Sequence, residues 1–287
     1  DNQILVDVRA AALNFSDLLM LNDSYQVRPS RPFTPGQEVA GVVMDVPPDS
    51  PWKISDRVTS KVEWGGFAEQ VLVRADMAIG IPDGNDFATA AALPVVYTTA
   101  MVALAACVVI SPADRVLVHA AAGGIGLASV EIAKAMGADV IATASSPEKL
   151  AIARHHGADV LINYSSDDWI GAVKEATKGK GANIIVDPVG GQIGEQSLKC
   201  IARDGTLLIV GFASGTIPKL EAHRLLLKRA AARGVYWNHD QDAAMLARVN
   251  RRLIELLDAG RINPVVDTQF GFEELPAALS ALQARQT

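Results

Sequence analysis

The spacing of apolar and polar positions changes near residue 95. Before that point, short apolar runs are separated by Pro, Gly and Asp turns, a pattern that predicts a small β-rich domain. Its candidate strands are Ile4 to Arg9, Val39 to Val46, Arg57 to Ser60 and Phe67 to Arg74. From about Pro94, apolar runs alternate with helical patterns. This alternation predicts an α/β domain with a doubly wound parallel sheet, the Rossmann arrangement.

Six runs are candidate strands of that sheet: 116–119, 139–143, 160–163, 184–187, 206–210 and 233–237. Beyond Asp240 we expect a helix over 243–259, an extended run over 265–270 and a helix from Glu273. We expect this tail to return to the first domain. The predicted boundaries are 1–95 with 239–287 for the β-rich domain, and 96–238 for the doubly wound domain.

The run Val116 to Gly126 reads VLVHAAAGGIG and opens into a helical pattern over 127–136. It matches a dinucleotide-binding turn in which Ala121 replaces the first glycine, Gly123 leaves room for a pyrophosphate, and Gly126 permits close helix packing. The helix N-terminus then offers unpaired N–H groups to phosphate. The alternative is a glycine-rich turn that serves packing alone. The predicted cofactor contacts here are Ala122, Gly123, Gly124, Ile125 and Gly126.

The second strand of this unit is followed by the sequence ASSPEK, residues 144–149. An acid at this point would bind a ribose 2′-hydroxyl and repel a 2′-phosphate, whereas Ser145, Ser146 and Lys149 would bind the phosphate. The sequence therefore predicts NADPH rather than NADH. In the alternative interpretation Ser146 caps a helix that begins at Pro147, with Lys149 in solvent. The segment can bind the 2′-phosphate and cap the helix at the same time.

Composition narrows the class of protein. The 287 residues carry a net charge of −6, which argues against a nucleic-acid partner. The two cysteines, Cys107 and Cys200, lie in apolar helical contexts and are expected to be free thiols in a reducing compartment. No apolar run is long enough for a membrane span and no signal-like segment begins the chain, so we expect a cytoplasmic protein without a membrane partner. Because the chain begins inside a strand-like run and ends in a helical pattern, we expect further flanking strands outside it.

Seven motifs distributed along the chain carry a family resemblance. They are the nucleotide loop above, Ala12–Asp17 (ALNFSD), Pro35–Gly41 (PGQEVAG), Gly65–Glu69 (GGFAE), Leu93-Pro94, Val186–Gly191 (VDPVGG) and Val210–Ser214 (VGFAS). With them the chain resembles the zinc-free quinone oxidoreductase branch of the medium-chain dehydrogenase/reductase superfamily. The resemblance implies that the β-rich part is a GroES-like catalytic domain. Enoyl-thioester reductases are similar in most of the same places.

Zinc-dependent alcohol dehydrogenases resemble the chain but differ at their metal ligands. They place a Cys where Asn14 stands, a His where Gln37 stands and another Cys near Pro94 to Val95. An amide or a proline cannot replace these ligands, and two cysteines cannot build a four-Cys structural lobe. We therefore expect chemistry without a metal. Glu38 is expected to be structural, pairing with backbone or with an Arg.

The resemblance also implies the site. The pocket would be lined by Asn14, Asp17, Tyr25 and 95–99, which makes Asn14, Asp17, Tyr25 and Tyr97 the candidate catalytic residues. The further cofactor contacts would be Thr98, Tyr164 near the 2′-phosphate, Val189, and Gly211, Phe212, Ala213 and Ser214 beside the nicotinamide.

Each of these residues has an alternative role. Asn14 would bond either the acceptor carbonyl or the nicotinamide ribose, and it is equally typical of a turn or a helix cap. Tyr25 is equally typical of a surface aromatic, and Tyr97 and Thr98 are typical of packing. His119 is expected to be a structural residue at a strand end rather than a catalyst. Asp187 is expected to shape the cofactor loop.

Three functions stay open. The leading hypothesis is an NADPH-dependent oxidoreductase that passes hydride to a quinone or small enone. The second is an enoyl-thioester reductase, which would need a basic rim that Arg28, Arg31 and Lys53 could supply. The third is a non-catalytic NADPH-binding protein.

Two surface features bear on partners. The run 234–237 at the predicted sheet edge resembles the strand by which relatives dimerise, so a homodimer is expected. Arg224, Lys228 and Arg229 form a basic cluster that is typical of a solvated helix face, although a 2′-phosphate partner from it is not excluded.

Overall fold

The computed structural model describes residues 2–25, 27–165 and 168–284. The chain forms two compact units: unit 1 comprises residues 1–96 and 264–287, and unit 2 comprises residues 97–263. The return to unit 1 therefore comes later than the predicted position 239. Helix α9 (His239–Asp258) stays in unit 2 because it buries Leu246, Val249 and Leu253 there and packs on α3 (Thr98–Met101).

Unit 1 is built on an antiparallel sheet with strand order β4-β1-β2-β3-β5. Its strands are β1 (Gln3–Ala12), β2 (Glu38–Asp45), β3 (Arg57–Lys61), β4 (Gln70–Arg74) and β5 (Ile79–Gly80). The four predicted strands match β1 to β4, and alternate residues such as Ile4, Val6 and Val43 point into the core.

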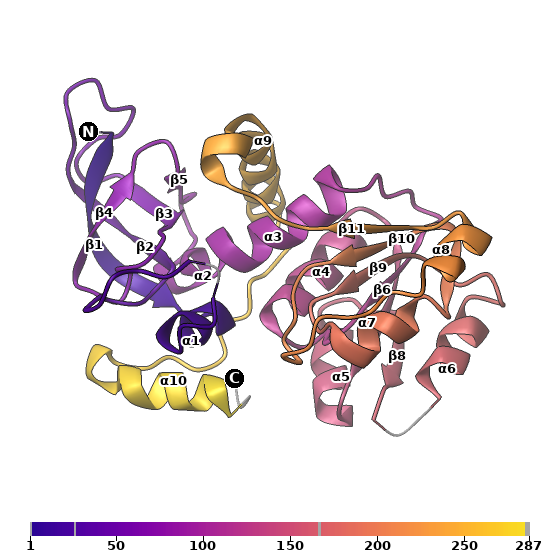
Figure 1. Cartoon of the computed structure of the whole chain (residues 1–287). Coiled ribbons are helices and arrows are strands. Elements are labelled where there is room, and N and C mark those ends of the chain that lie inside the picture. The colour runs from indigo at the N-terminus through magenta and orange to yellow at the C-terminus, as the bar shows by residue number, and fades with distance from the viewer. Residues whose placement is uncertain (1, 26, 166–167, 285–287) are drawn as a thin grey trace. The chain divides into compact units, whose positions relative to one another are not determined.

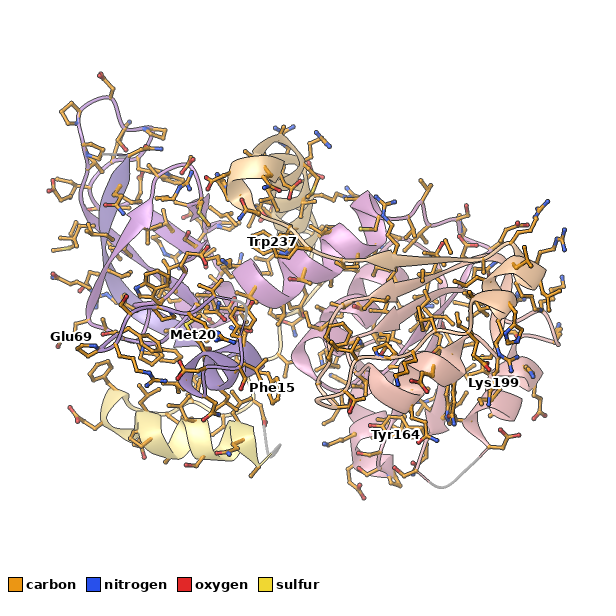
Figure 2. The ribbon with its side chains drawn as sticks, viewed as in Figure 1. Phe15, Met20, Glu69, Tyr164, Lys199 and Trp237 are labelled. Atoms are coloured by element: carbon orange, nitrogen blue, oxygen red, sulfur yellow. The ribbon has the colours of Figure 1, made fainter. Side chains whose placement is uncertain are left out.

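Three helices and a 3-10 turn complete unit 1. They are α1 (Phe15–Leu21), α2 (Phe87–Ala91), η3 (Phe272–Glu274) and α10 (Leu275–Gln283). Helix α10 packs against α1, where Met20 is buried and Phe15 is partly exposed (Figures 1 and 2). The predicted extended run 265–270 joins neither sheet, because no backbone pairing of these residues occurs within the described part of the chain.

Unit 2 is a doubly wound parallel sheet with strand order β11-β10-β9-β6-β7-β8 (Figure 1). The strands are β6 (Arg115–Val118), β7 (Asp139–Ala144), β8 (Val160–Asn163), β9 (Ala182–Asp187), β10 (Ile201–Ile209) and β11 (Ala231–Gly234). The predicted Rossmann architecture is confirmed.

Helices connect these strands. They are α4 (Gly124–Ala135), α5 (Pro147–His155), α6 (Trp169–Ala176), α7 (Gly191–Ser197) and α8 (Ala222–Lys228), with π-helices η1 (Leu93–Tyr97) and η2 (Val102–Ala106) flanking α3. None of the helices in the described ranges is long and apolar enough to cross a membrane.

The last strand differs from its prediction. It was expected over 233–237, but β11 ends at Gly234, three residues before Trp237. Val235 still donates its N–H to the Ile209 carbonyl at 2.9 Å, and the Trp237 indole donates to Thr99 Oγ1 at 3.1 Å. The apolar run therefore turns from the sheet edge toward α3.

The strand order defines where a ligand can approach unit 2. From β6 the chain moves outward through β7 and β8, and then returns to β9 on the other side of β6. The loops after β6 and β9 therefore diverge, and the carboxyl ends of these two strands form the crevice in which doubly wound sheets bind ligands.

Candidate functional site

The loop after β6 is anchored to the strands on both of its sides. His119 donates its N–H to the Val186 carbonyl at 3.1 Å, and Ala121 donates to the Thr143 carbonyl at 2.9 Å. Ala120 adopts a positive φ of 47° to make the turn into α4. The turn therefore holds the N-terminus of α4 at the carboxyl end of the sheet.

The two glycines of this loop have different reasons to be glycine. A Cβ on Gly126 would lie 2.2 Å from the Ala120 carbonyl oxygen, so the close approach of helix and turn requires Gly126. A Cβ on Gly123 would meet only that oxygen, at 3.5 Å, which is ordinary contact. Packing within the protein therefore does not demand Gly123. A bare backbone there leaves space in front of the first N–H groups of α4, as a bound diphosphate needs.

His119 is structural in this loop. It is fully buried, with Nδ1 2.8 Å from Thr143 Oγ1 and Nε2 2.9 Å from Ser197 Oγ. Burial lowers the pKa of His119 to about 3, so the ring is neutral at physiological pH. The prediction of a structural strand-end residue fits this geometry.

The residues after β7 show the predicted helix cap. Ser146 Oγ accepts the Lys149 N–H at 3.4 Å, and the Ser146 hydroxyl bond to Glu148 holds the pKa of that exposed carboxyl below its ordinary value. Ser145 and Lys149 are exposed. Among the described residues Lys149 Nζ makes no hydrogen bond or ion pair, so its charge is available to a ligand.

Tyr164 lies beside this segment. Ala144 and Asn163 are paired across β7 and β8, and Tyr164 donates its N–H to the Ala144 carbonyl at 3.1 Å. Its half-buried side chain packs on the core at the carboxyl end of β8 (Figure 2). The structure thus brings Ser145 and Tyr164, which were predicted separately, to adjacent strand ends.

Asp187 organises the loops after β9 and β10. Its Oδ1 accepts the N–H groups of Val189 and Gly190, both at 2.9 Å. The backbone N–H groups of Ala213 and Ser214 donate to the carbonyls of Pro188 and Val189, both at 3.0 Å. Burial raises the pKa of Asp187, and its Oδ2 has no partner in the described part of the chain. As expected, Asp187 shapes the loop.

The predicted nicotinamide contacts lie on this pair of loops. Val189 and Gly211 are half-buried, whereas Phe212, Ala213 and Ser214 are exposed. A Cβ on Gly190 would lie 2.8 Å from the Phe212 ring, so the two loops are closely packed. Their exposed edge belongs to the same carboxyl end of the sheet as Gly123.

Tyr97 and Thr98 are bound to other residues of unit 2. The Tyr97 hydroxyl donates to Glu131 Oε2 at 2.7 Å, and Thr98 Oγ1 donates to Asn250 Oδ1 at 3.3 Å. Both residues are only 2% exposed. These contacts agree with the packing alternative, and the catalytic role of Tyr97 and the cofactor contact of Thr98 stay predictions.

In unit 1, a buried polar cluster surrounds the start of α1. Asn14 Nδ2 donates to Glu38 Oε1 at 2.7 Å, and Glu38 Oε2 accepts the Val95 N–H at 2.8 Å. Asp17 Oδ2 accepts the Asn14 N–H at 2.8 Å, which secures the first turn of the helix. Glu38 pairs with backbone as expected, but its bond to Asn14 was missed, because no local pattern connects residues 24 positions apart.

Burial sets the protonation of both carboxyls in this cluster. It raises the pKa of Glu38 to about 8, against the opposing hydrogen bonds from Asn14 and Val95, and the charge of Asp17 adds to the rise. Burial likewise raises the pKa of Asp17 to about 6, against hydrogen bonds from the N–H groups of Asn14 and Gly36. The Asn14 side chain is thus fixed by a buried carboxyl that is protonated over much of the neutral range.

Asn14 and Gln37 stand where zinc-dependent alcohol dehydrogenases place metal ligands, and both make hydrogen bonds to other side chains. Ser16 donates its hydroxyl to Gln37 Oε1, and both Gln37 and Asn14 are buried. Over the described ranges, no three His, Cys, Asp or Glu side chains gather as a metal-binding group. Amide side chains already bound to protein partners are a poor donor set for Zn²⁺.

Tyr25 and the predicted basic rim lie on an exposed part of unit 1. Tyr25 is half-buried, and its carbonyl accepts from Arg28 Nε at 3.4 Å. Arg28 lines a surface hollow of about 680 Å³ formed by residues 28–30, 32–34, 64–65, 68 and 70–72. Arg31 and Lys53 are not among its lining residues, and Arg31 pairs with Asp23 at 3.2 Å. The three basic residues therefore do not assemble into one rim.

The basic residues Arg224, Lys228 and Arg229 lie at the surface, in agreement with the solvated face that their pattern favours. Arg224 pairs with Glu221, and Arg229 pairs with Asp204 at 2.7 Å. Lys228 is partly exposed at the end of α8. The two arginines are thus satisfied by neighbouring acids.

Comparisons with known proteins agree with this architecture. Residues 1–83 match the model of the alcohol dehydrogenase GroES-like domain, and residues 124–252 match that of the zinc-binding dehydrogenases. The chain is 37% identical over 292 residues to a quinone oxidoreductase-like protein 2 homolog of Nematostella vectensis, covering 100% of this chain and 80% of the relative.

Solved structures give the same assignment. Escherichia coli quinone oxidoreductase, solved with NADPH, superposes with a TM-score of 0.90 at 30% identity over 100% of this chain and 89% of that one. The CurK enoyl reductase superposes with a TM-score of 0.86 at 26% identity over 99% of this chain and 88% of that one. From these similarities and the two sheets described above, the chain belongs to the quinone oxidoreductase branch of the medium-chain dehydrogenase/reductase superfamily.

Proposed function

We propose that this chain is an NADPH-dependent oxidoreductase that reduces quinones or similar small enones without a metal. The observation that carries the proposal is the nucleotide loop of unit 2, where Gly123 leaves the N-terminus of α4 open and Ser145, rather than an acid, follows β7 directly. The E. coli enzyme with the same fold was solved with NADPH.

The residues of unit 2 would hold the cofactor. The N–H groups at the start of α4 bind the diphosphate, and Lys149 with Ser145 binds the 2′-phosphate beside Tyr164. The loop held by Asp187 carries the nicotinamide end, whose ring supplies hydride when the cofactor is bound. Ser146 contributes mainly by capping α5, because its hydroxyl is already bound to Glu148 and the Lys149 N–H.

Unit 1 would supply the polar contact for the acceptor. Charge that develops on a quinone or enone oxygen is delocalised, so a fixed hydrogen-bond donor can stabilise it without a Lewis acid. Asn14 is such a donor, because Glu38 fixes the orientation of its amide and leaves its second N–H for the acceptor. Asp17 holds the backbone of that turn, and Tyr25 is the further candidate to stack on a flat substrate.

The experiment that tests this function measures NADPH oxidation against a panel of quinones and a panel of enoyl-CoA thioesters. Turnover of quinones supports the proposal. Turnover of enoyl thioesters alone favours the second candidate, an enoyl-thioester reductase, which the similarity to CurK supports. Cofactor binding without turnover of either panel would contradict both and favour a binding protein.

We also propose a homodimer formed through β11. All four residues of this edge strand are exposed, and Leu226, Leu227 and Tyr236 nearby in sequence are large exposed apolar side chains. An open strand edge with apolar neighbours is satisfied by pairing with a second copy. Light scattering after size-exclusion chromatography should give twice the mass of the chain, and a monomer at micromolar concentration would contradict the proposal.

A cytoplasmic, reducing location is part of the same proposal. Cys107 and Cys200 are both free thiols. Burial raises the pKa of Cys200 to about 12, so this thiol is chemically inert. Free thiols are typical of reducing compartments.

A further inference from the structure

Glu131 on α4 gathers hydrogen bonds from three separate segments. Its Oε2 accepts the Tyr97 hydroxyl at 2.7 Å and the Asn263 N–H at 3.0 Å. Its Oε1 lies 2.7 Å from Nδ1 of His156, the residue that directly follows α5. The Glu131 side chain is only 6% exposed, so these contacts are made away from solvent. A single buried carboxylate thus joins α4 to segments that are 34, 25 and 132 positions away.

Two of the three donors lie where the chain passes from one unit to the other. The chain enters unit 2 at Tyr97 and leaves it after Asn263. Glu131 therefore holds both the first and the last residue of unit 2 on the same helix. Arg261 adds a second attachment of the last segment, because its guanidinium donates to the Ala135 carbonyl at the end of α4 at 3.1 Å.

The first crossing has an irregular backbone that needs such support. Residues 93–97 form the π-helix η1, a conformation that is rare and frequently occurs at functional sites. Burial and the neighbouring charge of Glu131 raise the pKa of Tyr97, so its hydroxyl stays protonated and donates to the carboxylate. The Tyr97 hydroxyl thereby has a defined structural role.

The helix that carries Glu131 also carries the candidate phosphate site. Seven positions separate Gly124 from Glu131, which places the carboxylate about 10 Å along the helix from its open N-terminus. We infer that Glu131 is a positioning residue that holds both crossings on the dinucleotide-binding helix, so that a cofactor bound at the N-terminus of α4 steadies both crossing segments together. The link to the cofactor rests on the proposed function, whereas the attachment of the crossings does not.

Hydrogen–deuterium exchange of the full chain, with and without NADPH, tests this inference. Glu131→Ala removes the shared acceptor, and Tyr97→Phe removes only the first donor. Ser129→Ala is the matched control, because Ser129 lies on the same helix, is fully buried, and has no hydrogen-bond partner for its Oγ among the described residues. Tyr97→Phe also keeps the test decisive if Glu131→Ala does not fold.

The expected pattern is specific to each variant. Without NADPH, Glu131→Ala speeds amide exchange roughly tenfold in both segments, 95–98 and 261–263. Tyr97→Phe speeds exchange in 95–98 alone. Ser129→Ala leaves exchange in both segments unchanged. With NADPH, exchange slows in both segments of the unaltered protein and of Ser129→Ala, but not in Glu131→Ala.

Two results would overturn the inference. The first is unchanged exchange of the crossings in Glu131→Ala, and the second is an increase spread evenly over unit 2 in Tyr97→Phe. If NADPH fails to protect 121–126 in the unaltered protein, the proposed function fails instead, and the exchange measured without NADPH still decides whether Glu131 holds the crossings.

Discussion

The two candidate half-sites are built in different ways. The half-site in unit 2 consists of backbone: a glycine turn, a helix N-terminus and two loops at strand ends, with Ser145, Lys149 and Tyr164 added at the edge. The half-site in unit 1 consists of buried side chains, Asn14, Asp17 and Glu38, which hold one another by hydrogen bonds. A backbone site leaves a local sequence pattern, whereas a side-chain cluster depends on residues that only the fold brings together.

The largest contrast is expected between the two glycines of the nucleotide loop. Gly126→Ala places a Cβ against the Ala120 carbonyl, so we expect it to lower the free energy of unfolding by about 3 kcal/mol and to abolish NADPH binding. Gly123→Ala meets only ordinary contacts, so its unfolding free energy should change by less than about 1 kcal/mol while NADPH affinity falls at least tenfold. Chemical denaturation and NADPH titration measure both, and equal losses of stability would remove the distinction between the glycines.

The unit 1 half-site is tested by Asn14→Ala. We expect kcat with a quinone to fall by about 100-fold, because a fixed donor to the developing oxyanion is lost, while the Kd for NADPH stays within about twofold. Asn22→Ala, at the other end of α1, is the control and should leave both values unchanged. A parallel loss of NADPH affinity in Asn14→Ala would show that the half-sites do not have separate tasks.

The contribution of charge to the unit 2 half-site is tested by Lys149→Ala. Loss of an ionic hydrogen bond to the 2′-phosphate should weaken NADPH binding by about 1–3 kcal/mol and leave NADH binding unchanged. Lys180→Ala removes another exposed lysine of unit 2 and should alter neither. If Lys149→Ala weakens NADPH and NADH equally, the 2′-phosphate is bound elsewhere.

The last effect is spread over several pH units and concerns the buried carboxyl of unit 1. Burial raises the pKa of Glu38 from its ordinary value of 4.5 to about 8 in the folded chain, so the folded state holds the proton more tightly between these two pH values. Glu38 should therefore make the unfolding free energy decrease as pH rises from about 5 to about 8, by at most about 1.4 kcal/mol per pH unit. Urea denaturation of the unaltered chain and of Glu38→Gln at several pH values measures the difference. Identical slopes would show that Glu38 is ionised throughout.

The same contrast explains how far the sequence alone predicts this molecule. Period-two and helical patterns locate all strands of both sheets except the two-residue β5, and the spacing of Gly123 and Gly126 locates the candidate nucleotide loop, because these features depend on near neighbours. Other features depend on distant contacts. The role of Tyr97 depends on Glu131, and the late return of the chain after Asn263 depends on the packing of α9 in unit 2. The end of β11 at Gly234 goes with the bond from Trp237 to Thr99. Such contacts over long sequence separations leave no periodic signal.

The Asn14–Glu38 bond belongs to the same class. The two residues lie in separate motifs, ALNFSD and PGQEVAG, each of which is recognisable by itself. Only the pairing of β1 with β2, in which Ala12 lies opposite Glu38, brings them together. Register, rather than local pattern, therefore assembles this half-site.

The most direct test of the proposed function is the rate of NADPH oxidation by one simple quinone after exhaustive dialysis against a chelator, with NADH measured in parallel. We predict that turnover with NADPH survives dialysis and exceeds turnover with NADH at equal concentration. Absence of turnover that added Zn²⁺ restores, or equal rates with the two cofactors, would contradict the account.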